Sequence, residues 1–394
     1  MQNNKCILLI TSSYPSNSDD IAGAFILDYI EEFKKQNVNV IVLTQANKKE
    51  FKKTEEQIDV IRFPWRNQSN EPLAYFSFSN FINIFFLIFA GVKYTRDILN
   101  EKKIDAILCL WIIPSGLYIY LLKLFYRKKF KTPYLVWALG SDIWKIRQIP
   151  ILGRFLLKNV INNSLVSYAD GIQLCKDSEE ISGKKCEFLS TSRLLRNNNN
   201  SKIELLPKDK KHFLFVGRFH KNKGPDILIE AISKISKDKL NFLHLHMFGL
   251  GPMESALKEL IVKNNLDNYI TFNGIIQADE LSKYLYSVSF LIIPSRIESI
   301  PVIFSDAMQC TTPVISTPTG DLPELISKYG CGILAKEITS EALALAIEEG
   351  LNRNRDDFLE QTKNMYQKFS INKNVSKLIE TINTQFTQKT HVQE

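Results

Sequence analysis

The chain has 394 residues, 45% of them hydrophobic, and is therefore long enough to form two domains with separate cores. Its net charge of +8 lies entirely in residues 1–200, and the amino terminus lacks the basic-then-apolar pattern of a secretion signal. The six scattered cysteines include no C-x-x-C pair, which argues against a disulfide framework or a zinc site and is typical of reduced thiols in a cytoplasmic protein.

Strands and helices are expected to alternate along the first half, with one helix over Phe25–Gln36. Residues 76–92 are aromatic and apolar, but their central run, Ile84–Val92, is well short of the roughly 20 residues that cross a bilayer. This length favours a buried or membrane-dipping helix over a spanning one. The strands predicted in this half are Cys6–Thr11, Val38–Thr44, Ala106–Leu110, Tyr134–Ala138 and Gly171–Leu174.

A basic cluster is the first candidate for a binding surface. It follows the apolar and aromatic stretch Leu117–Leu122 and contains Lys123, Arg127, Lys128, Lys129 and Lys131. Such a helix end is typical of proteins that lie on an anionic membrane, and a partly buried helix with a solvated basic tip would show the same pattern. A basic half also attracts nucleic acid, but no recognition motif supports that partner.

The second half repeats the alternation, and strands separated by helices of this size form parallel sheets. The sequence therefore predicts an α/β protein with two Rossmann-like domains joined at the asparagine-rich segment Arg196–Ser201. The expected domains span residues 1–195 and 196–370, and a last helix within 371–394 could pack back on the first domain. The predicted strands are His212–Val216, Phe242–Phe248, Ile270–Phe272, Phe290–Ile293, Pro313–Ser316 and Gly332–Leu334. The predicted helices are Asp226–Ser236, Met253–Asn264, Glu280–Tyr286, Pro301–Cys310, Leu322–Ser327 and Ser340–Leu351.

Two carboxylates, Glu298 and Asp306, stand eight positions apart after the apolar run Phe290–Pro294. Pro301 suits the first position of a helix, so Glu298 is expected in a strand-to-helix loop and Asp306 in the helix that follows. Open α/β sheets bind ligands at the edge where such loops lie, and the N–H groups of a helix start attract anions. Two acids at this place suit sugar hydroxyls, with a phosphate at the helix end.

Other strand-end loops carry residues that suit a phosphate ligand. Arg218 and Lys223 follow a predicted strand and would offer a diphosphate a planar fork and a point charge, although an exposed basic loop would look the same. Gly249 and Gly251 would let the backbone approach a ligand closely, but a lone G-x-G is a weak signal. The acids of Thr317–Glu324 fit either a ligand loop or plain helix caps.

The order of these motifs is more specific than any one of them. V-G-R-x₄-K-G from Val216, F-G-x-G-P from Phe248, N-G at Asn273, P-S-x-x-E-S-x-P-x₄-D from Pro294 and P-V-I-S-T-x-x-G-D-x-P-E from Pro313 together resemble the donor domain of GT-B glycosyltransferases. More narrowly, they resemble the retaining family 4 enzymes, the glycosyl transferases group 1. The resemblance covers about residues 212–335 and extends more loosely to Gly23, Trp111–Gly116 and Leu139–Asp142. It implies a GT-B fold, in which two Rossmann-like parallel-sheet domains face a central cleft.

The resemblance also implies roles for single residues. Arg218 and Lys223 would bind the diphosphate of a nucleotide-sugar donor, Glu298 would be the catalytic acid beside the transferred sugar, and Asp306 would bind the ribose hydroxyls. Further donor-binding residues would be Ser299, Ile300, Pro301 and Val302 at the helix start, the glycines Gly249, Gly251 and Gly274, and Gly23 from the first domain. Asp142 could orient acceptor hydroxyls, although a Ser-Asp pair that opens a helix is more often a cap.

Two positions depart from the family pattern. The second acid is Asp306 rather than a glutamate, and Leu139 stands where the family has a histidine that holds the donor sugar. All five histidines lie at position 212 or later. Two alternatives therefore stay open: a catalytically degenerate subunit that only binds nucleotide sugar, and a GT-B-fold sugar-nucleotide epimerase, which the histidine-free first half argues against. A dehydrogenase is disfavoured because no G-x-G-x-x-G follows either first strand.

The sequence thus predicts a retaining hexosyltransferase that moves a sugar from a nucleoside diphosphate sugar to an acceptor hydroxyl. No D-x-D triplet is present, so no metal is expected, and no cofactor is needed beside the sugar nucleotide. The basic, aromatic-rich first half favours a glycan or lipid-linked acceptor of bacterial polysaccharide biosynthesis. The expected location is the cytoplasm, peripheral on the inner face of the membrane.

Overall fold

The computed structural model describes residues 5–15, 23, 25–46, 58–65, 81–126, 129–149, 151–195, 206–207 and 209–390. The chain divides into two compact units, one formed by residues 1–191 with 371–394 and the other by residues 192–370. The division falls a few residues before the expected boundary, and the predicted join at 196–201 lies outside the described residues.

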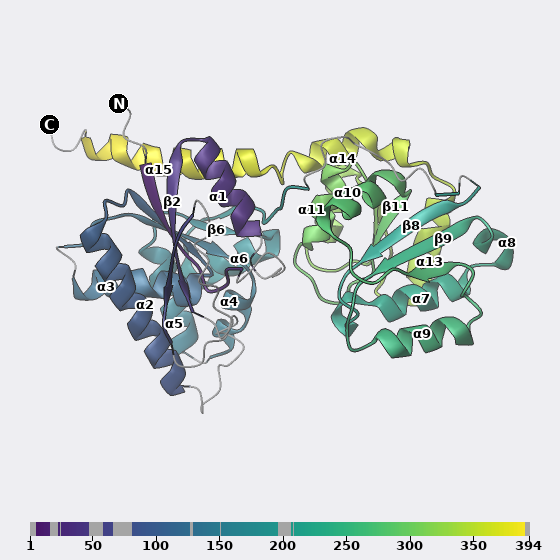
Figure 1. The fold of residues 1–394 in the computed structure, drawn as a ribbon, viewed down its shortest axis with the longest axis horizontal. Helices are drawn as coiled ribbons and strands as arrows, with labels where there is room; N and C mark the ends of the chain where they lie inside the picture. The colour runs from purple at the N-terminus through teal and green to yellow at the C-terminus, as the bar shows by residue number, and fades with distance from the viewer. Residues whose placement is uncertain are drawn as a thin grey trace. The chain divides into compact units, whose positions relative to one another are not determined.

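The first unit is built on a parallel sheet of seven strands in the order β3-β2-β1-β4-β5-β6-β7 (Figure 1). β1 is an inner strand and pairs in parallel with β2 and β4. These strands are near-continuous apolar runs because helices cover a parallel sheet on both faces. The strands are β1 Lys5–Ile10, β2 Val38–Gln45, β3 Asp59–Phe63, β4 Ala106–Leu110, β5 Tyr134–Ala138, β6 Ser167–Ala169 and β7 Cys186–Phe188.

Helices connect these strands, and the last helix of the chain, α15 (Ile371–Thr390), returns to the first unit. There it runs beside α1 (Figure 1), and Thr381 shares a 2.8 Å hydrogen bond with the hydroxyl of Tyr168. The other helices of this unit are α1 Phe25–Lys35, α2 Phe81–Glu101, α3 Leu117–Phe125, α4 Ser141–Trp144, α5 Leu152–Asn162 and α6 Ile172–Ser182. Two short helical turns, η3 Ile112–Gly116 and η4 Ile146–Gln148, complete it.

One strand prediction in the first unit is wrong. Gly171–Leu174 was expected as a strand because Ile172 and Leu174 alternate with polar residues, but α6 begins at Ile172. Leu174, Ser178 and Ile181 are buried at helical spacing, so one face of a helix produces the apparent alternation. The strand of this region is instead β6, which ends at Ala169, two residues before the predicted one begins. The short strands β3 and β7 were not expected.

The second unit contains a parallel sheet of six strands in the order β10-β9-β8-β11-β12-β13. All six predicted strands are present. They are β8 Lys211–Val216, β9 Leu243–Phe248, β10 Ile270–Phe272, β11 Phe290–Ile293, β12 Val314–Ser316 and β13 Gly332–Leu334. The helices are α7 Pro225–Lys234, α8 Lys237–Leu240, α9 Glu254–Lys263, α10 Ala278–Ser287, α11 Val302–Gln309, α12 Leu322–Tyr329, α13 Ser340–Leu351 and α14 Leu359–Tyr366, with the short turns η5 Lys221–Lys223 and η6 Arg355–Phe358.

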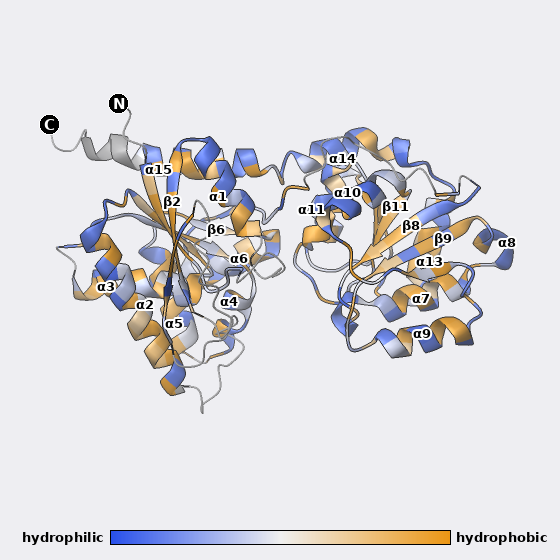
Figure 2. Cartoon of the chain, in the orientation of Figure 1, coloured by the Kyte–Doolittle hydropathy of each residue, from blue (hydrophilic) through white to orange (hydrophobic). Residues whose placement is uncertain are grey.

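Each unit has its own hydrophobic core, centred on its sheet. Figure 2 shows the strands of both sheets as hydrophobic, while α7 and α9 alternate between polar and apolar faces. None of the six cysteines, all of which lie in the described part of the chain, forms a disulfide. Among the described residues, no helix is long and apolar enough to cross a membrane.

Candidate functional site

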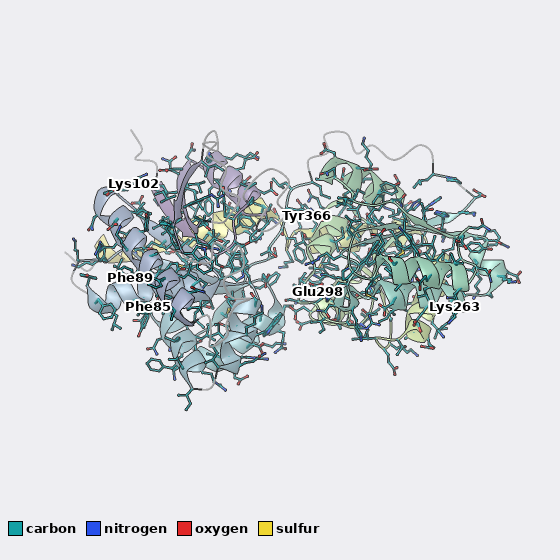
Figure 3. All side chains as sticks on the ribbon, turned by 60° about the horizontal axis from the view of Figure 1, so that its bottom comes forward. Phe85, Phe89, Lys102, Lys263, Glu298 and Tyr366 are labelled. Atoms are coloured by element: carbon teal, nitrogen blue, oxygen red, sulfur yellow. The ribbon has the colours of Figure 1, made fainter. Side chains whose placement is uncertain are left out.

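The candidate site is the edge of the second sheet at which its parallel strands end. Parallel strands bring their carboxyl ends to one edge, so loops that are far apart in sequence meet there. The loop after β8 contains Arg218 and Lys223, and the loop after β11 contains Glu298 (labelled in Figure 3). The loops after β9, β10 and β12 carry the remaining glycines and acids of the predicted donor site.

The structure brings Lys223 and Glu298 together. The Lys223 ammonium donates to the Glu298 carboxylate as an ion pair, although 75 positions separate the two residues. The Glu298 side chain is 17% exposed and that of Lys223 is 34% exposed, so both remain within reach of a ligand. Arg218, in the same loop as Lys223, is exposed and makes no ion pair with any described residue. A cation and an acid are thus in contact at the sheet edge, with a second cation nearby in sequence.

A second ion pair, which the sequence analysis missed, fastens these two loops to each other. Both guanidinium Nη atoms of Arg296 lie 2.7 Å from the two carboxylate oxygens of Asp226, and Nη1 also donates to the carbonyl of Lys221. Burial alone would raise the pKa of Asp226, but the Arg296 hydrogen bonds and charge hold it below its ordinary value. A bidentate pair of this kind fixes geometry as well as charge, so it sets the position of Glu298 relative to Lys223. Arg296 lies two residues before Glu298, but its partner is 70 positions away, and no pattern in the sequence links the two.

Two glycines allow the loops to approach closely. A Cβ added at Gly224, where φ is +66°, would lie 1.9 Å from the carbonyl oxygen of Pro294. A Cβ added at Gly320, where φ is +55°, would lie 2.3 Å from the carbonyl oxygen of Glu298. The next residue, Asp321, donates its N–H to the carbonyl of Ser299 at 3.2 Å. The loop that carries Glu298 is therefore contacted closely at its start, Pro294, and at Glu298 and Ser299, and residues with side chains would not fit at either glycine.

The glycines predicted to line the donor differ in their surroundings. A Cβ at Gly249 would lie 1.9 Å from the carbonyl oxygen of Gly217, and one at Gly251 would lie 2.4 Å from that of Phe219. These two positions therefore let the loop after β9 pack on the backbone of the loop after β8. Gly274 has φ of +71° and no described atom within 4 Å of an added Cβ, and its carbonyl accepts the N–H of Gly249 at 2.7 Å. Of the three, only Gly274 has open space where a side chain would be.

The start of α11 lies directly after Glu298. Ser299 and Ile300 are half-buried, and Val302 is 37% exposed. Pro301 was expected as the first helical residue, but its ψ of 137° makes it the N-cap, and α11 begins at Val302. The N–H groups of a first helical turn have few partners within the helix and favour a negative charge. The helix start is thus beside the Lys223–Glu298 pair, as the sequence predicts.

Asp306 lies on α11 but has no exposed surface. The Arg193 guanidinium binds it, with Nε 3.1 and 3.0 Å from the two carboxylate oxygens and Nη2 2.6 Å from Oδ2. The sequence analysis missed Arg193 because its motif begins after that residue. The carboxylate predicted to bind ribose is therefore already in an ion pair.

In the first unit, Gly23 precedes α1 with φ of +73°, and an added Cβ would lie 2.5 Å from the carbonyl oxygen of Ser13. Leu139, half-buried, follows β5. Asp142 is fully buried and accepts the N–H of Ile112 at 2.6 Å and that of Leu139 at 3.1 Å. Burial raises the pKa of Asp142 to about 6. Asp142 therefore holds the strand-end loops after β4 and β5 together. It does not cap α4, whose N-cap is Gly140 with no side-chain hydrogen bond, and its role toward an acceptor stays a prediction.

Among the described residues, no group of three or more His, Cys, Asp or Glu side chains is arranged to hold a metal ion.

Two family models match the chain. The model described as "Glycosyl transferases group 1" matches residues 196–380, and the model described as "Glycosyl transferase 4-like" matches residues 18–169.

Relatives and solved structures agree with these matches. An uncharacterized glycosyltransferase of Methanocaldococcus jannaschii is 32% identical over 292 residues, which are 72% of this chain and 78% of the relative. An amylovoran biosynthesis glycosyltransferase of Erwinia amylovora is 31% identical over 137 residues, 33% of each chain. Sucrose-phosphate synthase from Thermosynechococcus elongatus superposes with a TM-score of 0.74 at 18% identity, covering 98% of this chain and 100% of that one. The Anabaena protein HepE in complex with UDP superposes with a TM-score of 0.69 at 16% identity, covering 96% and 100%.

Proposed function

Because this chain belongs to the glycosyl transferases group 1 and has the GT-B fold, we propose that it transfers a sugar from a nucleoside diphosphate sugar to an acceptor hydroxyl with retention of the anomeric configuration. The observation that carries the proposal is the contact between Lys223 and Glu298 at the start of α11. It joins a cation suited to phosphate with an acid suited to sugar hydroxyls.

The site offers the groups that this reaction needs. When the bond between sugar and diphosphate breaks, negative charge develops on the departing phosphate, and preorganised positive groups lower the barrier most. Lys223, Arg218 and the helix start would stabilise that charge, so the proposed transfer needs no metal. Glu298 would then release Lys223 to the phosphate and face the sugar. Its role would be to stabilise the reacting sugar, while the leaving phosphate assists the incoming hydroxyl.

We further propose that the acceptor is a lipid-linked or cell-envelope glycan and that the enzyme works at the inner surface of the membrane. Support comes from the Erwinia relative, whose name refers to amylovoran biosynthesis. It also comes from α2, where Phe85 and Phe89 (labelled in Figure 3) are each 61% exposed. Exposed aromatic side chains on one helix favour a lipid interface. Phe125, 71% exposed at the end of α3, lies within the basic cluster, between Lys123 and Arg127; Arg127 and Lys128 are outside the described residues.

Turnover of sugar nucleotides tests the transferase proposal. We expect one of UDP-, GDP- and ADP-glucose, -galactose or -N-acetylglucosamine to raise the melting temperature by mass action. The same donor should release its nucleoside diphosphate when a bacterial lipid-linked glycan fraction is added. Glu298→Gln should abolish release, whereas Glu259→Gln, exposed on α9, should not. Product with an inverted anomeric centre would contradict retention.

A degenerate, donor-binding subunit is the second candidate, because Leu139 replaces a histidine and Asp306 is held by Arg193. It would show the melting shift but no release with any acceptor. The epimerase alternative would convert the sugar nucleotide to its epimer with no acceptor present, and no feature of the described site favours it over transfer.

A further inference from the structure

The chain passes between the two units twice, near residue 191 and near residue 370. We call each of these two connecting segments a passage. Side-chain contacts hold the chain before and after each passage to the unit in which it lies. The fastenings show a role for Asp306 that the sequence motif does not suggest.

The first passage is anchored on its first-unit side at Ser190. Its carbonyl accepts the hydroxyl of Tyr29 on α1 at 2.6 Å, and the Asn374 amide of α15 donates to its side-chain oxygen at 3.0 Å. The preceding residue, Leu189, has its carbonyl bonded by the indole N–H of Trp137 at 2.9 Å. The hydroxyl of Thr191 also donates to the carboxylate of Asp170 at 3.4 Å, so the chain is fixed to the first unit as far as residue 191.

On the second-unit side, the anchor begins at Arg193. Its guanidinium binds Asp306 on α11, its carbonyl accepts the Gln309 amide at 3.1 Å, and the N–H of Leu195 donates to the oxygen of that amide at 3.2 Å. Asp306 and Gln309 are three residues apart and so lie on one face of the helix. Ser192 lies between the last residue anchored in the first unit, Thr191, and Arg193.

The second passage ends on the same helix. Phe369, before the passage, packs edge-on against Phe304 of α11 with ring centroids 5.7 Å apart. After the passage, the Asn372 amide donates to the carboxylate of Glu32 on α1 at 2.7 Å. α11 therefore holds both passages in the second unit, and α1 receives both in the first.

We propose that Asp306 is a positioning residue that fastens the segment 192–195 to α11, and that it is not the ligand of the donor ribose. A carboxylate with no exposed surface requires a partner, and Arg193 supplies it through three short contacts. The aspartate side chain is also one methylene shorter than the family glutamate. The shorter side chain suits a contact with Arg193 close to α11 better than a reach to the ribose of a donor. Because α11 starts beside Glu298, this fastening would also couple the passage between units to the predicted phosphate site.

The anchoring itself is tested without any ligand, by hydrogen exchange and thermal unfolding of Arg193→Ala, Asp306→Ala and the double variant. The Leu195 amide should exchange at least tenfold faster in either single variant. The double variant should melt at or above the Arg193→Ala variant, because removing the acid relieves an unpaired buried charge. Arg353→Ala, which breaks the exposed pair with Asp357, is the matched control and should change neither measurement. Unchanged exchange at Leu195 in Asp306→Ala would overturn the proposal.

The exclusion of ribose binding rests on the proposed function and has its own measurement. Affinities for UDP, GDP and ADP are compared with those for the 2′-deoxy forms in the wild type and in Asp306→Ala. A carboxylate that binds ribose would give a preference of about tenfold or more for the ribose form that the variant loses. We expect the ratio to be the same in both proteins, and a lost preference would assign Asp306 to the donor. If no nucleotide binds the wild type, the proposed function fails while the exchange experiment still decides the anchoring.

Discussion

Replacing Lys223 by alanine is expected to weaken the binding of a nucleoside diphosphate strongly and to leave binding of the bare nucleoside nearly unchanged. Lys223 is 34% exposed and its only described ion-pair partner is Glu298, so a diphosphate competes with one carboxylate for it. A hydrogen bond to a charged group contributes about 1.5–3 kcal/mol, and each 1.4 kcal/mol is about a factor of ten in affinity. The expected loss is therefore roughly 10- to 150-fold for the diphosphate.

The same ion pair predicts the opposite effect for its partner. Glu298→Gln removes the charge that competes with phosphate for Lys223, so nucleoside diphosphate should bind at least as tightly as to the wild type. Transfer of the sugar should nevertheless be lost. Two variants of one contact thus change donor affinity in different directions, which a general loss of folding would not do.

Isothermal titration calorimetry with the diphosphate and the nucleoside, at two salt concentrations, measures these affinities. Lys221→Ala is the matched control because Lys221 is exposed in the same helical turn and contributes only its carbonyl to Arg296. It should shift the diphosphate affinity by less than about threefold, as expected for a surface charge. Equal losses for diphosphate and nucleoside in Lys223→Ala would refute the assignment of this lysine to phosphate.

Three further predictions follow from single features of the structure. Gly320→Ala should lower activity and destabilise the protein by more than the roughly 1–2 kcal/mol that a left-handed backbone costs a non-glycine residue, because the new Cβ would also meet the carbonyl of Glu298. In the control Gly274→Ala the space is open, so denaturant unfolding should show only the roughly 1–2 kcal/mol of the left-handed backbone. Burial, followed by the neighbouring His244 and His212, lowers the pKa of His246 to about 3, so on acidification the unfolded chain takes up the proton before the folded one does. The free energy of unfolding should therefore fall as the pH drops below 6.5, by about 2 kcal/mol at pH 5. Melting curves from pH 7 to 5 measure this loss, and it should be smaller in His246→Gln. Phe85→Ser with Phe89→Ser should reduce sedimentation with anionic liposomes severalfold, while Phe242→Ser, exposed in the second unit, should not; unchanged binding would count against the membrane proposal.

The six strands of the second unit, and the six helices predicted between them, agree with the structure to within a residue or two because the strands are short apolar runs bounded by turn residues. The helices α8 and α14 were not expected. Parallel pairing in this unit makes β8 and β11 neighbours and brings their carboxyl ends to one edge, so the loops that carry Lys223 and Glu298 were expected to lie close together. The first unit was less predictable. β3 has mostly half-buried residues, and Ile172 and Leu174 alternate like a strand while they belong to a helix.

Side-chain partners within the site were harder to predict than its place. The pair between Arg296 and Asp226 links residues 70 positions apart, and no periodicity points from one to the other. Gly320 is a similar case, since its need for φ of +55° depends on where the backbone of Glu298 lies. The motif identifies which residues gather at the sheet edge, but tertiary contacts decide which of them remain available to a ligand.

Asp306 illustrates this distinction. In the sequence it completes a two-acid pattern with Glu298, and both acids would be assigned to the donor. In the structure Glu298 is held by a lysine that is one-third exposed, so a phosphate can exchange with it, whereas Asp306 is buried and held through three contacts by a guanidinium. The cost of leaving a buried charge without its partner far exceeds that of separating an exposed pair. If Glu298 faces the reacting sugar as proposed, a ligand would exchange with the first pair and leave the second intact. The two acids of one motif would then have different roles, one at the sugar and one at the segment that connects the units.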